Sequence, residues 1–88
     1  MPASMGRIVH YTLTEQDAQA INQRRADFAD HRGNTAREGD AYPAVIVRTW
    51  ESSQNLKVLL DGTDDFWATS RTQGDGPGRW IWPPRVES

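Results

Sequence analysis

The chain of 88 residues is long enough for one small domain, and it carries a formal net charge of −2. It has no cysteine, which excludes disulfides and thiolate metal sites, and its apolar runs are too short to span a bilayer. Acidic and basic residues are balanced in both halves of the chain, so the sequence shows no basic face of the kind that binds nucleic acid through its phosphates.

The N-terminal part predicts one strand. Residues 1–5 lack the charged and apolar regions of a signal peptide, and we expect them to be disordered. Residues 6–13 are rich in β-branched and aromatic side chains, which is typical of a strand. Because side chains alternate along a strand, Val9, Tyr11 and Leu13 should share one face of it.

A helix should follow over about residues 15–29, where the chain has neither glycine nor proline. Thr14 and Asp17 have the spacing of a capping box, which favours a helix start at this point. Arg24 precedes Asp27 by three residues, and we expect these two side chains to pair on the solvent-exposed face. The apolar stripe of this helix is narrow and consists of Ala18, Ile21 and Phe28.

The rest of the chain predicts a loop and four strands. Residues 31–41 have no hydrophobic periodicity and contain two glycines, which indicates a loop. Short strands separated by turns should follow at residues 42–50, 55–60, 65–70 and 79–83. The valines and the isoleucine of 42–50 indicate that most of that strand is buried, and Asp61-Gly62 is a strong hairpin signal.

Short, closely spaced strands with glycine turns are typical of a small barrel. We predict a mainly β fold with one α-helix: an SH3-like β-barrel of about five strands, with the helix inserted after the first strand. It should form a single domain over residues 6–84, followed by a C-terminal tail at 85–88. Closure would remove the open sheet edges that invite aggregation. An open α+β sheet covered by the helix is the alternative.

The sequence contains no motif typical of catalysis. It has no nucleophile elbow, phosphate loop or HExxH motif, and its two histidines, His10 and His31, belong to separate elements. Asp61, Asp64 and Asp65 form the densest carboxylate cluster, but they lack the later bidentate Glu of a calcium loop. Hydrogen bonds to the turn backbone explain Asp61 and Asp64 without a metal. We therefore predict no enzymatic activity, metal or cofactor.

The four tryptophans point to a binding surface. Trp80 and Trp82 have the same parity, so both indoles should point to solvent if Ile81 faces the core. Trp67 should also be exposed, because it has the opposite parity to Phe66. The predicted binding face combines rings and carboxylates, which suit a proline-rich or cationic peptide. It consists of Tyr42, Trp67, Trp80, Trp82, Asp64 and Asp65. Packing of the indoles within the barrel is the alternative role.

A nucleic-acid interface is the weaker alternative. Aromatic rings can stack on single-stranded bases, but the neighbouring aspartates would repel the phosphates. Such an interface would depend on five arginines: Arg24, Arg25, Arg48, Arg71 and Arg79.

The segments GRIVHYTLTEQDAQAINQRR, HRGN, EGDAYPAVIVRTW, NLKVLLDG, FWATSR and GDGPGRWIWPP carry a resemblance. Over nearly the whole of residues 6–84 the chain resembles a group of small uncharacterised proteins encoded by tailed bacteriophages and prophages of actinobacteria. The resemblance implies a phage product that acts in the host bacterial cytoplasm or is a minor part of the virion. It supplies no catalytic residues.

Together these observations favour a non-enzymatic binding module that engages a host or phage protein through an aromatic face. The first alternative is a nucleic-acid-associated accessory protein. The second is a structural virion component in which the aromatic face is a homo-oligomer interface.

Overall fold

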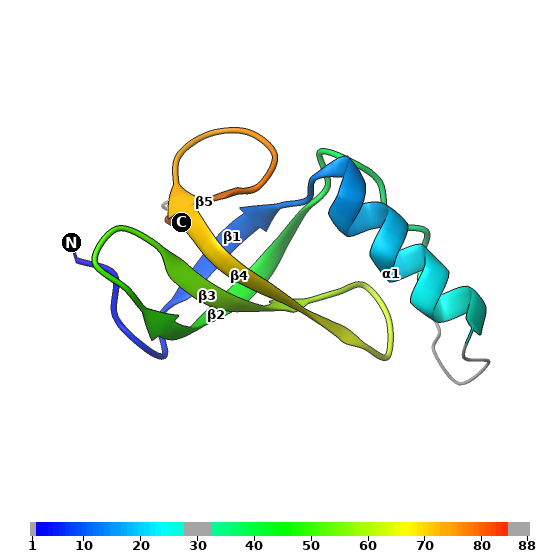
Figure 1. The fold of residues 1–88 in the computed structure, drawn as a ribbon, viewed down its shortest axis with the longest axis horizontal. Coiled ribbons are helices and arrows are strands. Elements are labelled where there is room, and N and C mark those ends of the chain that lie inside the picture. The colour runs from blue at the N-terminus through cyan, green and yellow to red at the C-terminus, as the bar shows by residue number, and fades with distance from the viewer. Residues whose placement is uncertain (1, 28–32, 85–88) are drawn as a thin grey trace, which may run out of the picture.

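The computed structural model describes residues 2–27 and 33–84. Five strands close into a barrel and one helix lies between the first and second strands (Figure 1), which confirms the predicted small barrel with an inserted helix. The elements are β1 (Ile8–Thr12), α1 (Glu15–Asp27), β2 (Ala41–Thr49), β3 (Gln54–Leu59), β4 (Asp65–Gln73) and β5 (Arg79–Ile81). No helix in the described ranges is long and apolar enough to cross a membrane.

The barrel is a meander that β5 closes. β1, β2, β3 and β4 pair in sequence order, each antiparallel to the next. β5 then pairs antiparallel with β1 through Trp80 and Ile81, and parallel with β4 through Arg79 and Trp80. Because β5 is only three residues long, most of β4 pairs with a neighbouring strand on one side only.

The alternation predicted for the first strand is confirmed, and the third strand also buries alternate apolar residues. Val9, Tyr11 and Leu13 are fully buried, and Leu56 and Val58 are buried with them. The prediction for the second strand is only half right. Ala44 and Ile46 of β2 are buried, but Val47 is 38% exposed, because nothing in the described chain covers the outward side of β2. In the fourth strand Ala68 is buried and Trp67 is exposed, as expected.

Two irregularities in strand pairing help to curl the sheet. The register shifts between Ile46 and Arg48 where β2 meets β3, and again at Asn55 where β3 meets β4. At the second shift Ser70 has a positive φ of 54°, and its backbone N–H donates to Asn55 Oδ1 at 2.8 Å. The side chain of Asn55 thus replaces a missing ladder bond. Bulges of this kind bend strands and increase their twist, which favours closure of a short sheet.

The helix begins as the sequence predicts. The Asp17 N–H donates to Thr14 Oγ1 at 2.9 Å, and the Thr14 N–H donates to Asp17 Oδ2 at 3.1 Å, so the capping box is reciprocal. Ala18 and Ile21 are buried against the core, whereas Phe28, the third member of the predicted stripe, lies outside the described residues.

The helix covers one end of the barrel and is joined to both ends of β4 by arginine side chains. Near its start Asp17 accepts a hydrogen bond from Arg71 Nη2 at 3.0 Å, and near its end Arg24 donates to the Asp65 carbonyl at 2.6 Å. The helix therefore runs in the opposite direction to β4 (Figure 1).

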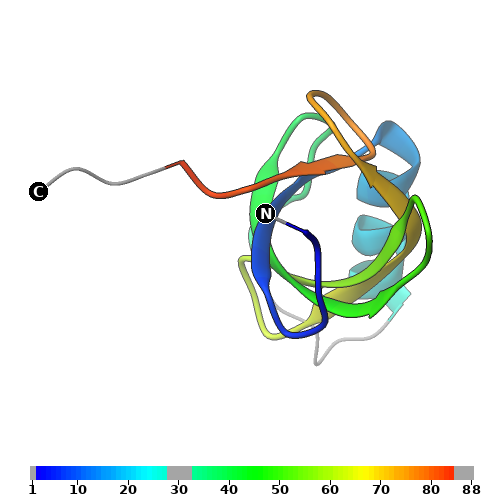
Figure 2. The same ribbon diagram turned by 90° about the vertical axis from the view of Figure 1, so that its left-hand side faces the viewer.

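The N-terminal segment, which we expected to be disordered, is described from residue 2. Ala3 packs against the core, and the Gly6 N–H donates to the Ile46 carbonyl at 2.7 Å. Figure 2 shows this segment folded across one opening of the barrel. We call this opening the mouth, and the opposite end, where the helix lies, the helix end.

The expected orientation of the last strand is wrong. Trp80 is only 1% exposed, whereas Ile81 is 36% exposed, so the indole and not the isoleucine faces the core. The pairing of Trp80 with Tyr11 explains this result, because cross-strand partners share a face and Tyr11 points inward. Trp82 is half-buried, with its ring 5.2 Å from that of Trp80 in an edge-on arrangement of 83°.

Candidate binding face

The six residues of the predicted binding face do not form one groove. Trp80 is buried and Trp82 packs against it near the mouth. Trp67 lies on the outward side of β4, and Asp65 has the same parity on that strand. The remaining two, Tyr42 and Asp64, belong to the helix end.

The carboxylate of Asp64 forms salt bridges with two arginines of the helix. Its carboxylate lies 2.9 Å from Arg24 Nη2 and 2.8 Å from Arg25 Nη2, and its side chain is only 5% exposed. The hydrogen bond from Arg25, together with the Arg24 guanidinium, lowers the pKa of Asp64 to about 2. The expected pair between Arg24 and Asp27 is therefore wrong, because the hairpin turn brings a better carboxylate to the same helix face. Asp27 instead accepts a hydrogen bond from Gln23 at 3.0 Å.

The arginines of the nucleic-acid alternative are largely engaged within the chain. Arg24 and Arg25 are paired with Asp64, and Arg71 is paired with Asp17 at 3.0 Å. Arg48 lies over the Trp50 ring at 4.2 Å. Arg48 and Arg79 are exposed, but two exposed arginines are a small contribution to phosphate binding, which grows with the number of contacts.

Apolar side chains gather instead on the outward side of the sheet. One outward row crosses four strands, since Ile8, Val45, Lys57 and Trp67 are successive cross-strand partners. The neighbouring row pairs Ile81 with His10, and Leu59 with Asp65. We call this surface the outer face and define it by its six apolar members: Ile8, Val45, Val47, Leu59, Trp67 and Ile81.

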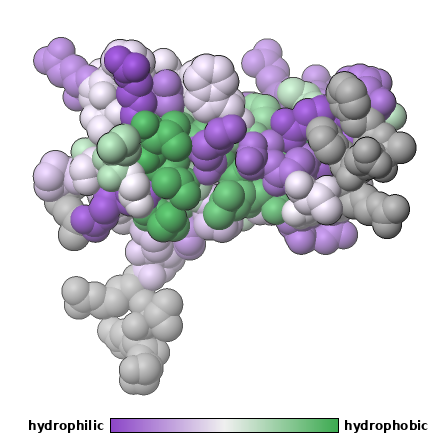
Figure 3. Space-filling view, turned by 90° about the horizontal axis from the view of Figure 1, so that it is seen from below, coloured by the Kyte–Doolittle hydropathy of each residue, from purple (hydrophilic) through white to green (hydrophobic). Residues whose placement is uncertain are grey.

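The outer face is exposed to solvent. Ile8 and Leu59 are each 47% exposed, and Trp67 is 60% exposed. The helix packs on the core at one end of the barrel, so it leaves these side chains uncovered. Figure 3 shows hydrophobic residues gathered on the side of the molecule seen from below, with hydrophilic residues around them.

A charged pair lies within the outer face. Lys57 Nζ is 3.4 Å from Asp65 Oδ1, and both side chains are about half exposed, at 49% and 53%. Lys57 lies directly opposite Trp67, and Leu59 lies directly opposite Asp65. The pair therefore places one positive and one negative charge between an indole and a leucine. Such a surface offers apolar area together with polar groups that can orient a partner.

Sequence reasoning found Trp67 but missed its neighbours. The signal was present, because Ile8 and Leu59 have the outward parity in strands whose inward residues were recognised correctly. Large apolar residues at outward positions of two strands already indicate an apolar outer surface. What the sequence does not show is that the barrel brings these positions side by side.

Within the described ranges, no three His, Asp or Glu side chains lie close enough together to hold a metal ion. His10 is half-buried on β1, and His31 lies outside the described residues. Comparison of the chain with protein families, curated proteins and solved structures finds no match.

Proposed function

We propose that this chain is a non-enzymatic protein-binding module and that the outer face is its binding surface. The observation that carries the proposal is the exposure of Ile8, Leu59 and Trp67 in two neighbouring outward rows that the helix leaves uncovered. The resemblance to phage and prophage proteins suggests a phage or host protein as the partner.

The composition of the outer face supports a protein partner. Interfaces are enriched in tryptophan, and tryptophans often make the largest contributions to binding. Trp67 has Leu59 diagonally across from it on β3 and the aliphatic stem of Lys57 directly opposite. The Lys57–Asp65 pair can exchange its mutual contact for contacts with the partner, because exposed pairs of this kind are weak.

The outer face also differs from the groove predicted from the sequence. It uses one indole instead of three, and aliphatic side chains supply the rest of its area. Aromatic grooves are what bind proline-rich peptides, whereas a mixed aliphatic and aromatic face suits a folded surface or an amphipathic helix. We therefore propose a folded partner or a helix.

Capture experiments with paired variants test this proposal. The full chain is immobilised and exposed to a lysate of the bacterial host, and the captured protein is then titrated against each variant by calorimetry. Trp67→Ser and Leu59→Ser should each weaken binding by about 30-fold or more, as expected for residues at the centre of an interface. Trp50→Ser changes an equally aromatic but separate exposed site, so it should bind like the unaltered chain.

Three outcomes would contradict the proposal. Binding that is lost in Trp50→Ser but kept in Trp67→Ser would move the site to the mouth. Concentration-dependent self-association that Leu59→Ser abolishes would make the outer face a homo-oligomer interface instead. Salt-dependent binding to random-sequence DNA, unaffected by either outer-face variant, would favour the nucleic-acid alternative.

A further inference from the structure

A second candidate site lies at the helix end, away from the outer face. The segment 33–40 between the helix and β2 borders an open depression with a volume of about 560 Å³. Its lining is Asn34, Thr35, Arg37, Asp40, Ala41 and Tyr42. Small-molecule sites in proteins have volumes of roughly 300–1,000 Å³. None of the six lining residues belongs to the outer face.

Hydrogen bonds to its backbone hold the segment beside the depression in place. The side-chain amide of Asn22, on the helix, donates to the Ala36 carbonyl at 2.8 Å and accepts from the Ala36 N–H at 3.0 Å. The Asn34 N–H donates to the Asp61 carbonyl at 2.9 Å, which ties the segment to the β3–β4 hairpin. At the other end, the Leu13 N–H donates to the Asp40 carbonyl at 2.8 Å. A segment fixed at both ends loses little freedom when it binds a ligand.

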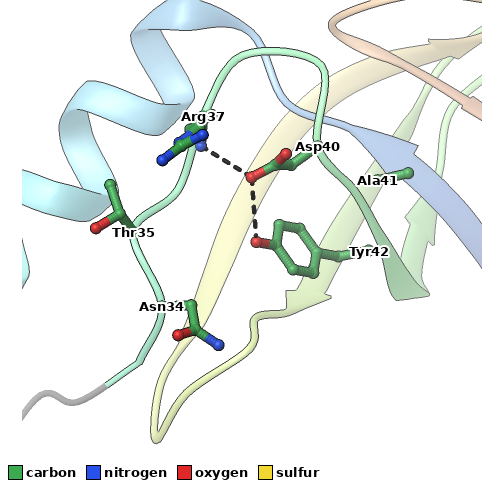
Figure 4. A pocket seen from close by; sticks show the side chains of 6 residues that line it. All are labelled: Asn34, Thr35, Arg37, Asp40, Ala41 and Tyr42. Carbon is green, nitrogen blue, oxygen red and sulfur yellow. Dashed lines mark hydrogen bonds between the residues drawn. The ribbon is translucent and has the colours of Figure 1, made fainter.

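Of the polar side chains around the depression, Asn34 donates from Nδ2 to the Asp61 carboxylate and keeps its Oδ1 as an acceptor. Asp40 Oδ2 accepts from the Arg37 N–H at 3.0 Å and from the Tyr42 hydroxyl at 3.4 Å, which orients the carboxylate (Figure 4). Figure 4 shows Asp40 and Tyr42 extending into the space that the segment borders, with Arg37 and Thr35 on the segment itself. In the described part of the chain, no side chain pairs with the guanidinium of Arg37.

The charged and polar side chains that line the depression favour some classes of ligand over others. Asp40 would repel a phosphate, and Arg37 would repel a simple cation, so neither kind of ion suits the depression. A guanidinium, a carboxylate, an amide, a hydroxyl and a phenol together offer several donors and several acceptors to a neutral molecule. Burial and the nearby Asp40 carboxylate raise the pKa of Tyr42, so its hydroxyl remains a donor over the physiological range.

We infer that this depression binds a neutral, hydroxyl-rich ligand of the sugar class. The charged and amide groups of Arg37, Asp40 and Asn34 match vicinal hydroxyls, each of which both donates and accepts. The ring of Tyr42 supplies an apolar surface beside these polar groups. The inference does not depend on the proposed protein-binding function, because the two sites share no residue.

Backbone amide NMR of the full chain tests the inference. Glucose, galactose, mannose and N-acetylglucosamine are titrated separately, with inorganic phosphate and methylguanidine as charged probes. At least one sugar should shift the amides of residues 34–42 with a millimolar dissociation constant, which is typical of such small ligands. Arg37→Ala removes a side chain without a described partner, so it should fold normally and weaken sugar binding by about tenfold.

Tyr42→Phe and Trp67→Ser serve as a matched pair. Tyr42→Phe keeps the ring and removes only the hydroxyl, and it should also weaken sugar binding severalfold. Trp67→Ser should leave sugar binding unchanged, which separates this site from the outer face. Absence of sugar-dependent shifts in residues 34–42 would overturn the inference. Shifts that survive both Arg37→Ala and Tyr42→Phe, or that phosphate or methylguanidine produces instead, would overturn it as well.

Discussion

The two ends of the barrel are closed by different physical means. At the mouth, the Trp80 indole is buried and donates from Nε1 to Gln54 Oε1 at 2.9 Å, with Trp82 and Ala3 packed beside it. At the helix end, Ala18 and Ile21 are buried too, but charged hydrogen bonds from Arg24 and Arg25 to Asp64 also hold the helix in place.

Because of this difference, the two ends should respond to different perturbations. Burial of an indole stabilises through the apolar area removed from water and does not depend on the protonation of any group. A carboxylate held by two guanidinium groups stabilises only while it is ionised. The mouth should therefore be sensitive to side-chain size and the helix end to charge and pH.

Loss of the Trp80 side chain should have the largest effect. Trp80→Ala leaves a cavity in a fully buried site, and we expect the free energy of unfolding to fall by about 3–5 kcal/mol. Urea denaturation followed by circular dichroism measures the loss. Because this variant is at risk of not folding at all, Trp80→Phe provides a milder change with a smaller loss. Trp50→Ala, at an exposed indole of the same end, should lose about 1 kcal/mol or less; an equal loss in both would contradict the burial of Trp80.

Removal of the charge at the helix end should have the next largest effect. Asp64→Asn leaves Arg24 and Arg25 partly buried without a counter-ion, and we expect a loss of about 2–3 kcal/mol at neutral pH. Asp65→Asn is the matched control, since its pair with Lys57 is about half exposed and should contribute less than ~0.5 kcal/mol. Equal stabilities of the two variants in urea would show that the Asp64 cluster does not hold the helix end.

The pH dependence of stability should separate the two ends more finely. The pKa of Asp64 is lowered from 3.8 to about 2, so the unfolded chain binds this proton more tightly than the folded chain. The stabilisation is present above about pH 5 and is lost as the pH falls through 4 toward 2, by on the order of 1–2 kcal/mol. Urea midpoints measured from pH 7 to pH 2.5 should fall less steeply in Asp64→Asn than in the unaltered chain. Trp80→Phe should keep the unaltered slope, and a flattened slope in that variant would contradict the division between the ends.

Relief of backbone strain should have the smallest effect. Ser70 has a φ of 54°, a region that glycine enters more easily than serine, and Ser70→Gly should raise stability by about 0.5–1 kcal/mol. The hydrogen bond from the residue 70 N–H to Asn55 is retained in this variant. Asn55→Ala, which removes the acceptor, should lower stability instead, and thermal unfolding of the two variants should show shifts of opposite sign.

Local patterns in the sequence determined much of the fold. The alternation of residues 8–13 and 55–60 placed Val9, Tyr11 and Leu56 inside, because in each strand only one parity is consistently apolar. Thr14 and Asp17 set the start of the helix through contacts three residues apart. Short strands and glycine turns then favoured a closed barrel, since a small open sheet would leave its edges unpaired.

Only the tertiary structure decided the orientation of the last strand and the pairs that join distant segments. In Trp80-Ile81-Trp82 the residues on both faces of the strand are apolar. The alternation therefore shows that the two indoles share a face, but it does not show which face is buried. The pairing of Trp80 with the inward-pointing Tyr11 turns the Trp80 indole into the core. Arg25 and Asp64 are 39 residues apart, and no local rule relates them. Local periodicity reports neighbours within an element, whereas burial and charge pairing depend on which elements the closed barrel brings together.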